Sequence, residues 1–200
     1  MIENGLIKSV QGLTSPLSLL EAKRHLRIIG VDSDDAYIQD CIDSAEAILE
    51  EQTMLALRQS QYVSTFPSFM TTLRNMQNLY LYRNPVVNII SFTMLDIDNI
   101  PRTVTNYQLR TSLYPATLAP LAGQFWPLSK YRTMEAIRVE YTAGFASFAL
   151  PPKLKLAMRY LVAHLYEMRE PIIAQSGVLP YEIPKSITAL INSLKYGGFM

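Results

Sequence analysis

The sequence predicts an α+β protein: a helical domain into which a small antiparallel β-unit is inserted. Apolar residues recur at helical spacing before residue 55 and again after residue 150. Between these regions, short runs of β-branched and aromatic residues are separated by turn signals. Of the 200 residues, 49% are hydrophobic and 18% are charged, which is enough apolar material for one compact core or two small ones.

The first helix is predicted over residues 15–28, SPLSLLEAKRHLRI. Ser18 and Glu21 have the spacing of a capping box, in which each side chain bonds to a backbone amide of the first helical turn. The apolar face of this helix is formed by Leu19, Leu20, Ala22 and Leu26.

A second amphipathic helix is predicted over residues 32–53. Its apolar positions are Ile38, Cys41, Ile42, Ala45, Ile48 and Leu49. The same span holds eight acidic residues and no lysine or arginine: Asp32, Asp34, Asp35, Asp40, Asp43, Glu46, Glu50 and Glu51. One interpretation is a solvated outer face; the other is a face presented to a basic partner, or to DNA that must slide past.

The inserted β-unit is predicted from runs at 61–66, 79–83, 86–95, 107–110 and 136–142. Ile137, Val139 and Tyr141 alternate with polar residues, as a half-buried strand requires. Turn signals such as DIDN (residues 96–99) separate the runs, and the region from Pro115 to Gly123 is interpreted as one of these turns. Trp126 is expected to be a buried corner of the β-unit.

A structural joint is predicted where the last strand meets the next helix, at Gly144, Pro151 and Pro152. The glycine suits a positive φ at the strand exit, and a proline suits a first helical turn. The long helix is predicted over residues 151–169, and a short one runs through Ile187 to Leu194 and ends at Gly197. The predicted parts are residues 1–60 (helical), 61–146 (β-unit), 147–175 (long helix) and 176–200 (C-terminal arm).

The alternative interpretation of the joint is a reactive turn with Thr142 or Ser147 as a nucleophile. No histidine or lysine lies close by in sequence to activate either hydroxyl. His25 and His164 fall within helices without metal-ligand spacing, and Cys41 falls on an apolar helix face. We therefore expect packing roles for these three residues, no catalytic residues, no metal and no cofactor, and we expect that the protein is not an enzyme.

The net charge is +1, which lacks the basic surplus of a dedicated nucleic-acid binder. A single cysteine excludes an intramolecular disulfide and suits a reducing compartment. The N-terminus lacks the pattern of a signal peptide, and no uncharged apolar run reaches 18 residues. A membrane partner is therefore not expected.

Several features of the sequence occur in order between residues 15 and 196: the first two predicted helices, LYLYRNPVVNIISFTMLD, GQFWP, IRVEYTAGF, PPKLKLAMRYLVAHLYEMRE and LPYEIPKSITALINSLKY. In this order they resemble head-tail connector proteins of tailed bacteriophages, also called adaptor or head-completion proteins. The most specific part is YTAGF followed by AMRYLVAHLYEMRE. The long branch of this family, with an inserted β-domain, is the one that this sequence is similar to.

The resemblance implies a structural, non-enzymatic protein of the virion neck that is present in the host cytoplasm during assembly. Such proteins form a homo-oligomeric ring, usually of twelve subunits, beneath the portal protein. The ring extends the DNA channel, through which DNA passes without sequence-specific binding, and it carries stopper or tail proteins. The abundance of tyrosine, 12 residues, suits a chain whose flanks both meet neighbours.

The resemblance also suggests site residues. The C-terminal segment of the family commonly reaches toward the portal, so Tyr181, Tyr196, Phe199 and Met200 are candidate portal contacts. Asp35, Asp43 and Glu50 are candidate channel-facing or partner-facing acids. Deletion of residues 181–200 is expected to leave the fold largely intact and to abolish assembly on the portal. The alternatives are a stopper or tail-completion protein and, from another class, a small enzyme or ligand-binding domain that uses a pocket of the β-unit.

Overall fold

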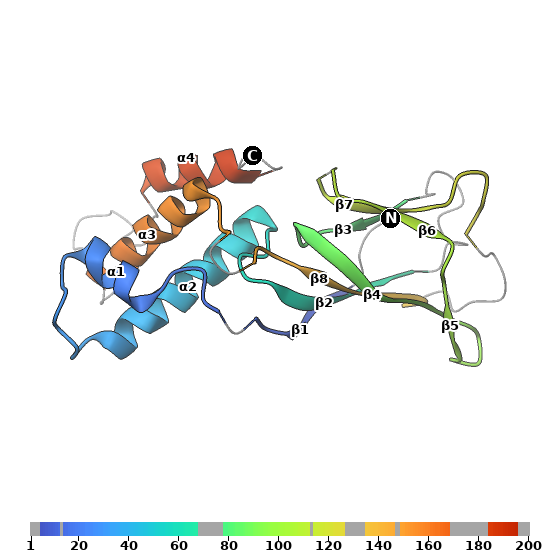
Figure 1. The fold of residues 1–200 in the computed structure, drawn as a ribbon, viewed down its shortest axis with the longest axis horizontal. Helices are drawn as coiled ribbons and strands as arrows, with labels where there is room; N and C mark the ends of the chain where they lie inside the picture. The colour runs from blue at the N-terminus through green and yellow to red at the C-terminus, as the bar shows by residue number, and fades with distance from the viewer. Residues whose placement is uncertain are drawn as a thin grey trace, which may run out of the picture. The chain divides into compact units, whose positions relative to one another are not determined.

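The computed structural model describes residues 5–12, 14–67, 78–112, 114–126, 135–146, 149–168 and 184–195. The chain divides into two compact units (Figure 1). Met1–Thr14 and Arg58–Ala146 form the first, here called the strand unit; Ser15–Leu57 and Ser147–Met200 form the second, here called the helical unit. The described residues contain four helices and antiparallel sheets, so the predicted α+β class is confirmed.

The helical unit contains α1 (Leu19–Leu26), α2 (Asp35–Thr53), α3 (Pro152–Glu167) and α4 (Lys185–Leu194). All four helices were predicted, with ends shifted by a few residues; α4 stops at Leu194, and Gly197 lies outside the described residues. Helix α2 packs most extensively against α3 and also contacts α1 and α4. The core of the helical unit consists of side chains at the predicted helical spacing in α2, α3 and α4, among them Ile38, Ile42, Leu49, Leu154, Leu161 and Ile191.

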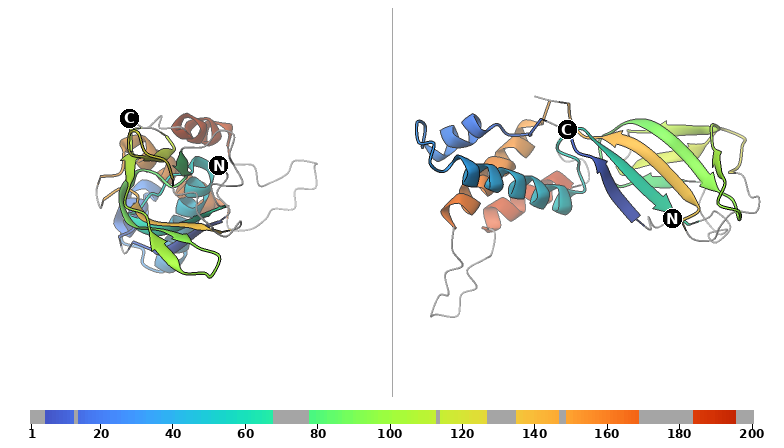
Figure 2. Two further views of the ribbon diagram at one scale, coloured as in Figure 1. Left: turned by 90° about the vertical axis from the view of Figure 1, so that its right-hand side faces the viewer. Right: turned by 90° about the horizontal axis from the view of Figure 1, so that it is seen from below.

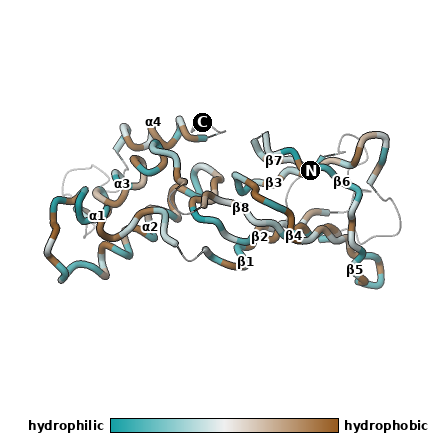
Figure 3. Tube along the Cα trace, viewed as in Figure 1, coloured by the Kyte–Doolittle hydropathy of each residue, from teal (hydrophilic) through white to brown (hydrophobic). Residues whose placement is uncertain are grey.

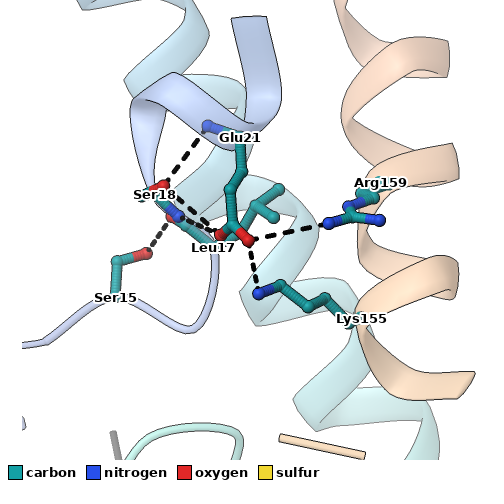
Figure 4. Close-up of polar contacts among 6 residues, drawn as sticks. All are labelled: Ser15, Leu17, Ser18, Glu21, Lys155 and Arg159. Atoms are coloured by element: carbon teal, nitrogen blue, oxygen red, sulfur yellow. Dashed lines mark hydrogen bonds and ion pairs between the residues drawn. The ribbon is translucent and has the colours of Figure 1, made fainter. Parts of the chain in front are cut away.

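The predicted capping box is present at the start of α1 (Figure 4). The Glu21 amide donates to Ser18 Oγ at 3.2 Å, and the Ser18 amide donates to Glu21 Oε2 at 3.3 Å. Glu21 Oε1 also accepts from Lys155 Nζ at 2.5 Å and lies 3.6 Å from an Arg159 nitrogen. One carboxylate therefore both caps α1 and ties it to α3. Burial opposes ionisation of Glu21, but Lys155 and Ser18 outweigh it and hold its pKa below the ordinary value.

The acidic segment before α2 is anchored to the rest of the helical unit. The buried Lys23 forms ion pairs with Asp32, at 2.7 Å, and with Asp35. Tyr166 donates its hydroxyl hydrogen to Asp34 Oδ2 at 2.7 Å. The hydrogen bonds that Lys23 donates to Asp32 and Asp35 raise the pKa of Lys23 above its ordinary value. Asp34 and Asp35 are half-buried and take part in the packing of the helical unit, whereas the side chain of Asp32 is 86% exposed.

The strand unit contains two antiparallel sheets, whose strands lie side by side in Figures 1 and 2. The five-stranded sheet has the order β1 (Gly5–Val10), β2 (Ser60–Phe66), β8 (Ile137–Ala143), β4 (Val86–Leu95) and β5 (Pro101–Thr103). The three-stranded sheet has the order β3 (Leu79–Leu81), β7 (Ala116–Pro120) and β6 (Tyr107–Arg110).

The core of the strand unit lies between residues that are distant in sequence. Tyr62 of β2 pairs in register with Tyr141 of β8, and both are fully buried. Phe92 of β4 is also buried, and its ring lies 5.4 Å from the rings of Tyr107 and Trp126. Because Tyr107 belongs to the other sheet, Phe92 joins the two sheets. The predicted burial of Trp126 is confirmed.

Three strands were not predicted from the sequence. β1 comes from the N-terminal segment and forms an edge of the five-stranded sheet, and the short β5 forms the other edge. The interpretation of the region from Pro115 to Gly123 as a turn is wrong for Ala116–Pro120, which is β7. β7 is buried along its whole length between β3 and β6, so it shows none of the alternation that marks a half-buried strand.

Candidate interaction surfaces

The predicted joint residues lie at the ends of secondary-structure elements. Gly144 follows β8 directly and has a φ of +119°, and its amide donates to the Pro85 carbonyl at 2.8 Å. A Cβ atom at Gly144 would lie 2.2 Å from the Arg58 carbonyl oxygen. Pro151 is the N-cap of α3 and Pro152 is its first residue. Glycine at 144 is thus required both by the backbone angle and by the close approach of another segment.

A second glycine packs against the same segment. A Cβ atom at Gly12 would lie 2.2 Å from the Gln59 carbonyl oxygen. The Gly12 amide donates to Ser60 Oγ at 3.0 Å, and its carbonyl accepts from Arg58 at 3.2 Å. Residues 58–60, where the chain enters the strand unit, are therefore in close contact with both Gly12 and Gly144. This cluster fixes the chain segments at one end of the strand unit.

The residues considered as possible catalytic groups, where the structure describes them, lie in a strand or pack against other side chains. Thr142 is in β8 and pairs with Gln61, while Ser147 lies outside the described residues. The His25 ring lies 6.0 Å from the Tyr160 ring, and burial, together with the nearby Arg159 charge, lowers the pKa of His25. Cys41 is 4% exposed, as predicted. Within the described part of the chain, no group of three His, Cys, Asp or Glu residues is placed to hold a metal ion.

The three candidate acids lie in different environments. Asp43 is exposed and accepts from the Gln39 amide nitrogen at 3.4 Å. Asp35 is paired with Lys23, and Glu50 is buried and accepts from the Leu57 amide at 2.9 Å. Glu50 therefore holds the chain that follows α2 and does not offer its carboxylate to solvent. Of the three, Asp43 is the acid that presents its side chain on an outer surface of the described chain.

The candidate portal contacts Tyr181, Tyr196, Phe199 and Met200 lie outside the described residues. The deletion of residues 181–200, which was expected to test them, would also remove α4. Ile187, Ile191 and Leu194 of this helix are buried. Removal of three buried aliphatic side chains destabilises a core, so the deletion cannot be neutral for the fold. A truncation after Lys195 tests the last three candidates and retains α4.

A shallow hollow of about 400 Å³ lies on the strand unit beside β6 and β7. Its lining consists of amide, small and apolar side chains with one cation, among them Asn78, Gln108, Arg110, Gln124 and Phe125. Gln108 donates to the Pro120 carbonyl at 3.3 Å, which holds its amide against the sheet. None of these lining groups is a usual general acid or base near neutral pH. The hollow therefore lends no support to the enzymatic alternative.

The hairpin between β4 and β5 ends in an ordered apolar tip, here called the hairpin tip (residues 96–100). Asp96 Oδ1 accepts from the amides of Asp98 and Ile100 at 3.0 and 2.9 Å, and Asp96 Oδ2 accepts from Arg102 at 3.3 Å. These bonds, led by that from Ile100, hold the pKa of Asp96 below its ordinary value of 3.8. Ile97 and Ile100 are nevertheless 59% and 55% exposed.

Sequence reasoning identified DIDN as a turn but did not identify the tip as an interaction surface. The available signal was the pair of isoleucines in and beside the polar turn DIDN. Figure 3 shows that apolar and polar segments alternate in the β4–β5 hairpin. An exposed branched aliphatic residue by itself is common. Two of them on a turn that three hydrogen bonds hold in place form a preorganised contact surface.

No helix among the described residues is long and apolar enough to cross a membrane. No protein-family model matches the chain, and no curated protein matches it by sequence.

Solved structures do match. A chain in the virion of a native gene transfer agent (GTA) particle is similar over 98% of this chain and 99% of that chain, with a TM-score of 0.74 and 23% sequence identity. A chain in the neck of an empty GTA particle, computed with C6 symmetry, is similar over 96% of this chain and 95% of that chain, with a TM-score of 0.74 and 22% sequence identity.

A third match is to the neck of a native GTA particle computed with C12 symmetry. It covers 98% of this chain and 96% of that chain, with a TM-score of 0.70 and 24% identity. In all three matches the likeness spans nearly the full length of both chains. The combination of a helical unit and a strand unit is therefore shared as a whole fold.

Proposed function

We propose that this protein is a structural adaptor subunit of the neck of a tailed, phage-like particle. In this proposal, twelve copies form a ring beneath the portal, extend the DNA channel and receive the stopper or tail proteins. The single observation that carries the proposal is the near full-length likeness to chains of GTA virions and necks. One of these necks was computed with C12 symmetry, which supports a ring of twelve copies.

The charge distribution supports a head-to-tail arrangement, in which the strand unit of one copy contacts the helical unit of the next. The strand unit holds nine Lys and Arg and five Asp and Glu, a net charge of +4, and the helical unit holds nine and twelve, a net charge of −3. A closed ring needs two different complementary surfaces on each subunit. Opposite charge on the two units favours contacts between unlike units of adjacent copies over contacts between like units.

Asp43 keeps its proposed role as an outward-facing acid, directed at the channel or at a basic partner. It is exposed on α2, a helix without lysine or arginine. In the channel it would repel the phosphate backbone, so that DNA slides without being held. Phe199, Met200 and Tyr196 remain proposed portal contacts, and Tyr181 remains a further one.

Electron microscopy of the chain mixed with the portal protein of the same particle tests the proposal. We expect twelvefold density directly beneath the portal, and we expect the truncation after Lys195 to weaken binding to the portal without loss of helix content. Density that contacts only the distal side of another ring would assign the protein to the stopper or tail-completion class. No binding to any neck component would refute a neck role.

A further inference from the structure

We propose that the hairpin tip of one copy binds the exposed face of α1 on the next copy. This inference rests on the proposed ring, and it names the two surfaces that form the contact between subunits. The first surface is the hairpin tip, with Ile97, Asp98 and Ile100. The second, here called the arginine patch, consists of Leu20, Arg24, Arg27, Ile29 and Val31.

The arginine patch combines exposed apolar side chains with cations. Leu20 and Arg24 are four residues apart, which places them on one side of α1, and Arg27 is the C-cap that follows the helix. Leu20 and Ile29 are 51% and 65% exposed, and both arginines are exposed. Among the described residues, neither guanidinium group has an ion pair or a hydrogen bond. Arginine is enriched in protein interfaces relative to the rest of the protein surface.

The end of the patch is held in a defined conformation. Arg27 adopts a left-handed conformation with a φ of 61°, and its amide donates to the Arg24 carbonyl at 3.3 Å. The Ile28 amide donates to the Lys23 carbonyl at 3.1 Å. This pair of bonds is the usual cap at the end of a helix, and it fixes the direction in which Ile29 leaves α1. The acid next to the patch, Asp32, forms an ion pair with Lys23 at 2.7 Å, although its side chain is 86% exposed.

The hairpin tip complements this patch in charge. Asp96 is paired with Arg102, whereas Asp98 is exposed and has no side-chain partner among the described residues. The tip therefore presents one unpaired carboxylate between two exposed isoleucines, and the patch presents two unpaired guanidinium groups beside exposed aliphatic residues. Arginine and carboxylate groups form the stronger class of charged hydrogen bond, and the aliphatic side chains of both surfaces gain from leaving water.

A second copy is the occupant that these features favour. The tip belongs to the strand unit and the patch to the helical unit, so each copy carries both halves of the contact. Such a contact is heterologous, and it propagates from copy to copy in the way that a ring requires. The acid on the tip disfavours phosphate-bearing partners such as DNA or anionic lipid.

Disulfide trapping tests the contact in the full-length chain. In a Cys41→Ala background, one batch carries Ile100→Cys and a second carries Ile29→Cys. We expect an equimolar mixture to form a cross-linked dimer under mild oxidation, and we expect each batch alone to remain monomeric in a denaturing gel. A chain that carries both substitutions should give a ladder of oligomers. The matched control pairs Val10→Cys, which is also exposed, with Ile29→Cys.

A charge exchange gives an independent measurement. Asp98→Lys should lower the yield of the cross-link by roughly tenfold or more, since it places a cation against two arginines. Arg24→Glu combined with Arg27→Glu in the partner batch should recover much of that yield. A control pair that cross-links as well as the predicted pair, or efficient cross-linking of the Ile100→Cys batch with itself, would overturn the proposal.

The outcomes separate this inference from the proposed function. If twelvefold rings form on the portal and the predicted pair does not cross-link, another surface joins the subunits and the adaptor role stands. If the tip instead cross-links to the portal or a tail protein, the second copy is the wrong occupant. If neither rings nor cross-links form, the contact is refuted and the adaptor role loses its support.

Discussion

The helices of the helical unit are determined by residues that are close in sequence, whereas the strands of the strand unit pair with residues that are far away in sequence. Helix α1 begins at a capping box whose two members are three residues apart, and α2 has its apolar face at regular helical spacing. In the strand unit, β2 pairs with β8 so that Tyr62 lies opposite Tyr141, and β1 pairs with β2 so that Gly5 lies opposite Thr65. Local signals thus place the helices, and distant pairing places the strands.

The same difference predicts how the units respond to mutation. Trp126 is the single tryptophan and lies in the core of the strand unit, whereas the helices dominate the circular dichroism signal at 222 nm. Tryptophan fluorescence therefore reports mainly on the strand unit, and circular dichroism reports mainly on the helical unit. Denaturant unfolding followed by both probes can compare the two units in the intact chain.

The largest effect is expected for Phe92→Ala, because this ring joins the two sheets. Truncation of a buried phenylalanine costs about 4 kcal/mol, so the free energy of unfolding reported by Trp126 fluorescence should fall by that amount. Phe125→Ala is the matched control: its ring is 77% exposed, and the expected change is below about 0.5 kcal/mol. Equal shifts of both probes would mean that the two units unfold as one.

Gly144→Ala should have the next largest effect. The added Cβ would meet the Arg58 carbonyl oxygen and would sit on a backbone with a φ of +119°. We expect a loss of about 3 kcal/mol from the strain and the overlap together. Gly123→Ala separates the two causes, since it also has a positive φ, of +77°, but a Cβ there meets nothing within 4 Å. A cost as large at Gly123 as at Gly144 would argue against the close approach.

Ser18→Ala tests the capping box at the start of α1 in the helical unit. Loss of the N-cap hydroxyl, which accepts from the Glu21 amide, should lower the free energy of unfolding seen by circular dichroism by about 1 kcal/mol. Ser44→Ala, at an exposed position inside α2, should change it by no more than about 0.5 kcal/mol. A loss seen equally by Trp126 fluorescence would contradict the assignment of the effect to the helical unit.

The contrast between the units also explains what could be predicted from the sequence. The helices and the capping box were predicted because period and cap chemistry are properties of neighbouring residues. β7 was taken for a turn, because its central place between β3 and β6 and the burial of all five of its residues arise only in the folded sheet. β1 was missed because its partner β2 is distant in sequence, with Gly5 opposite Thr65. The isoleucines of the tip were visible in the sequence, but the exposure of the tip and of the patch could not be derived, since exposure depends on which faces the fold leaves uncovered.

The smallest effect on stability is expected at the hairpin tip. Here hydrogen bonds between residues close in sequence fix the conformation of a short exposed part of the strand unit. Because hydrogen bonds lower the pKa of Asp96, its ordering of the tip should be fully present above the ordinary pKa of 3.8 and should be lost as the pH falls through the lower folded value. The amide chemical shifts of Asp98 and Ile100 measure this order. In Asp96→Asn the side-chain oxygen still accepts from these amides but does not ionise, so the low-pH transition of the Ile100 amide shift should be absent.

The control for that measurement is Asp98→Asn, which removes the exposed acid next to the hydrogen-bonded one. It should leave the low-pH transition of the Ile100 amide in place, because Asp96 and not Asp98 accepts that hydrogen. A transition that survives in Asp96→Asn and disappears in Asp98→Asn would reverse the assignment. The tip would then depend on the exposed carboxylate, and Asp98 would not be available, as proposed, for the arginines of a neighbouring copy.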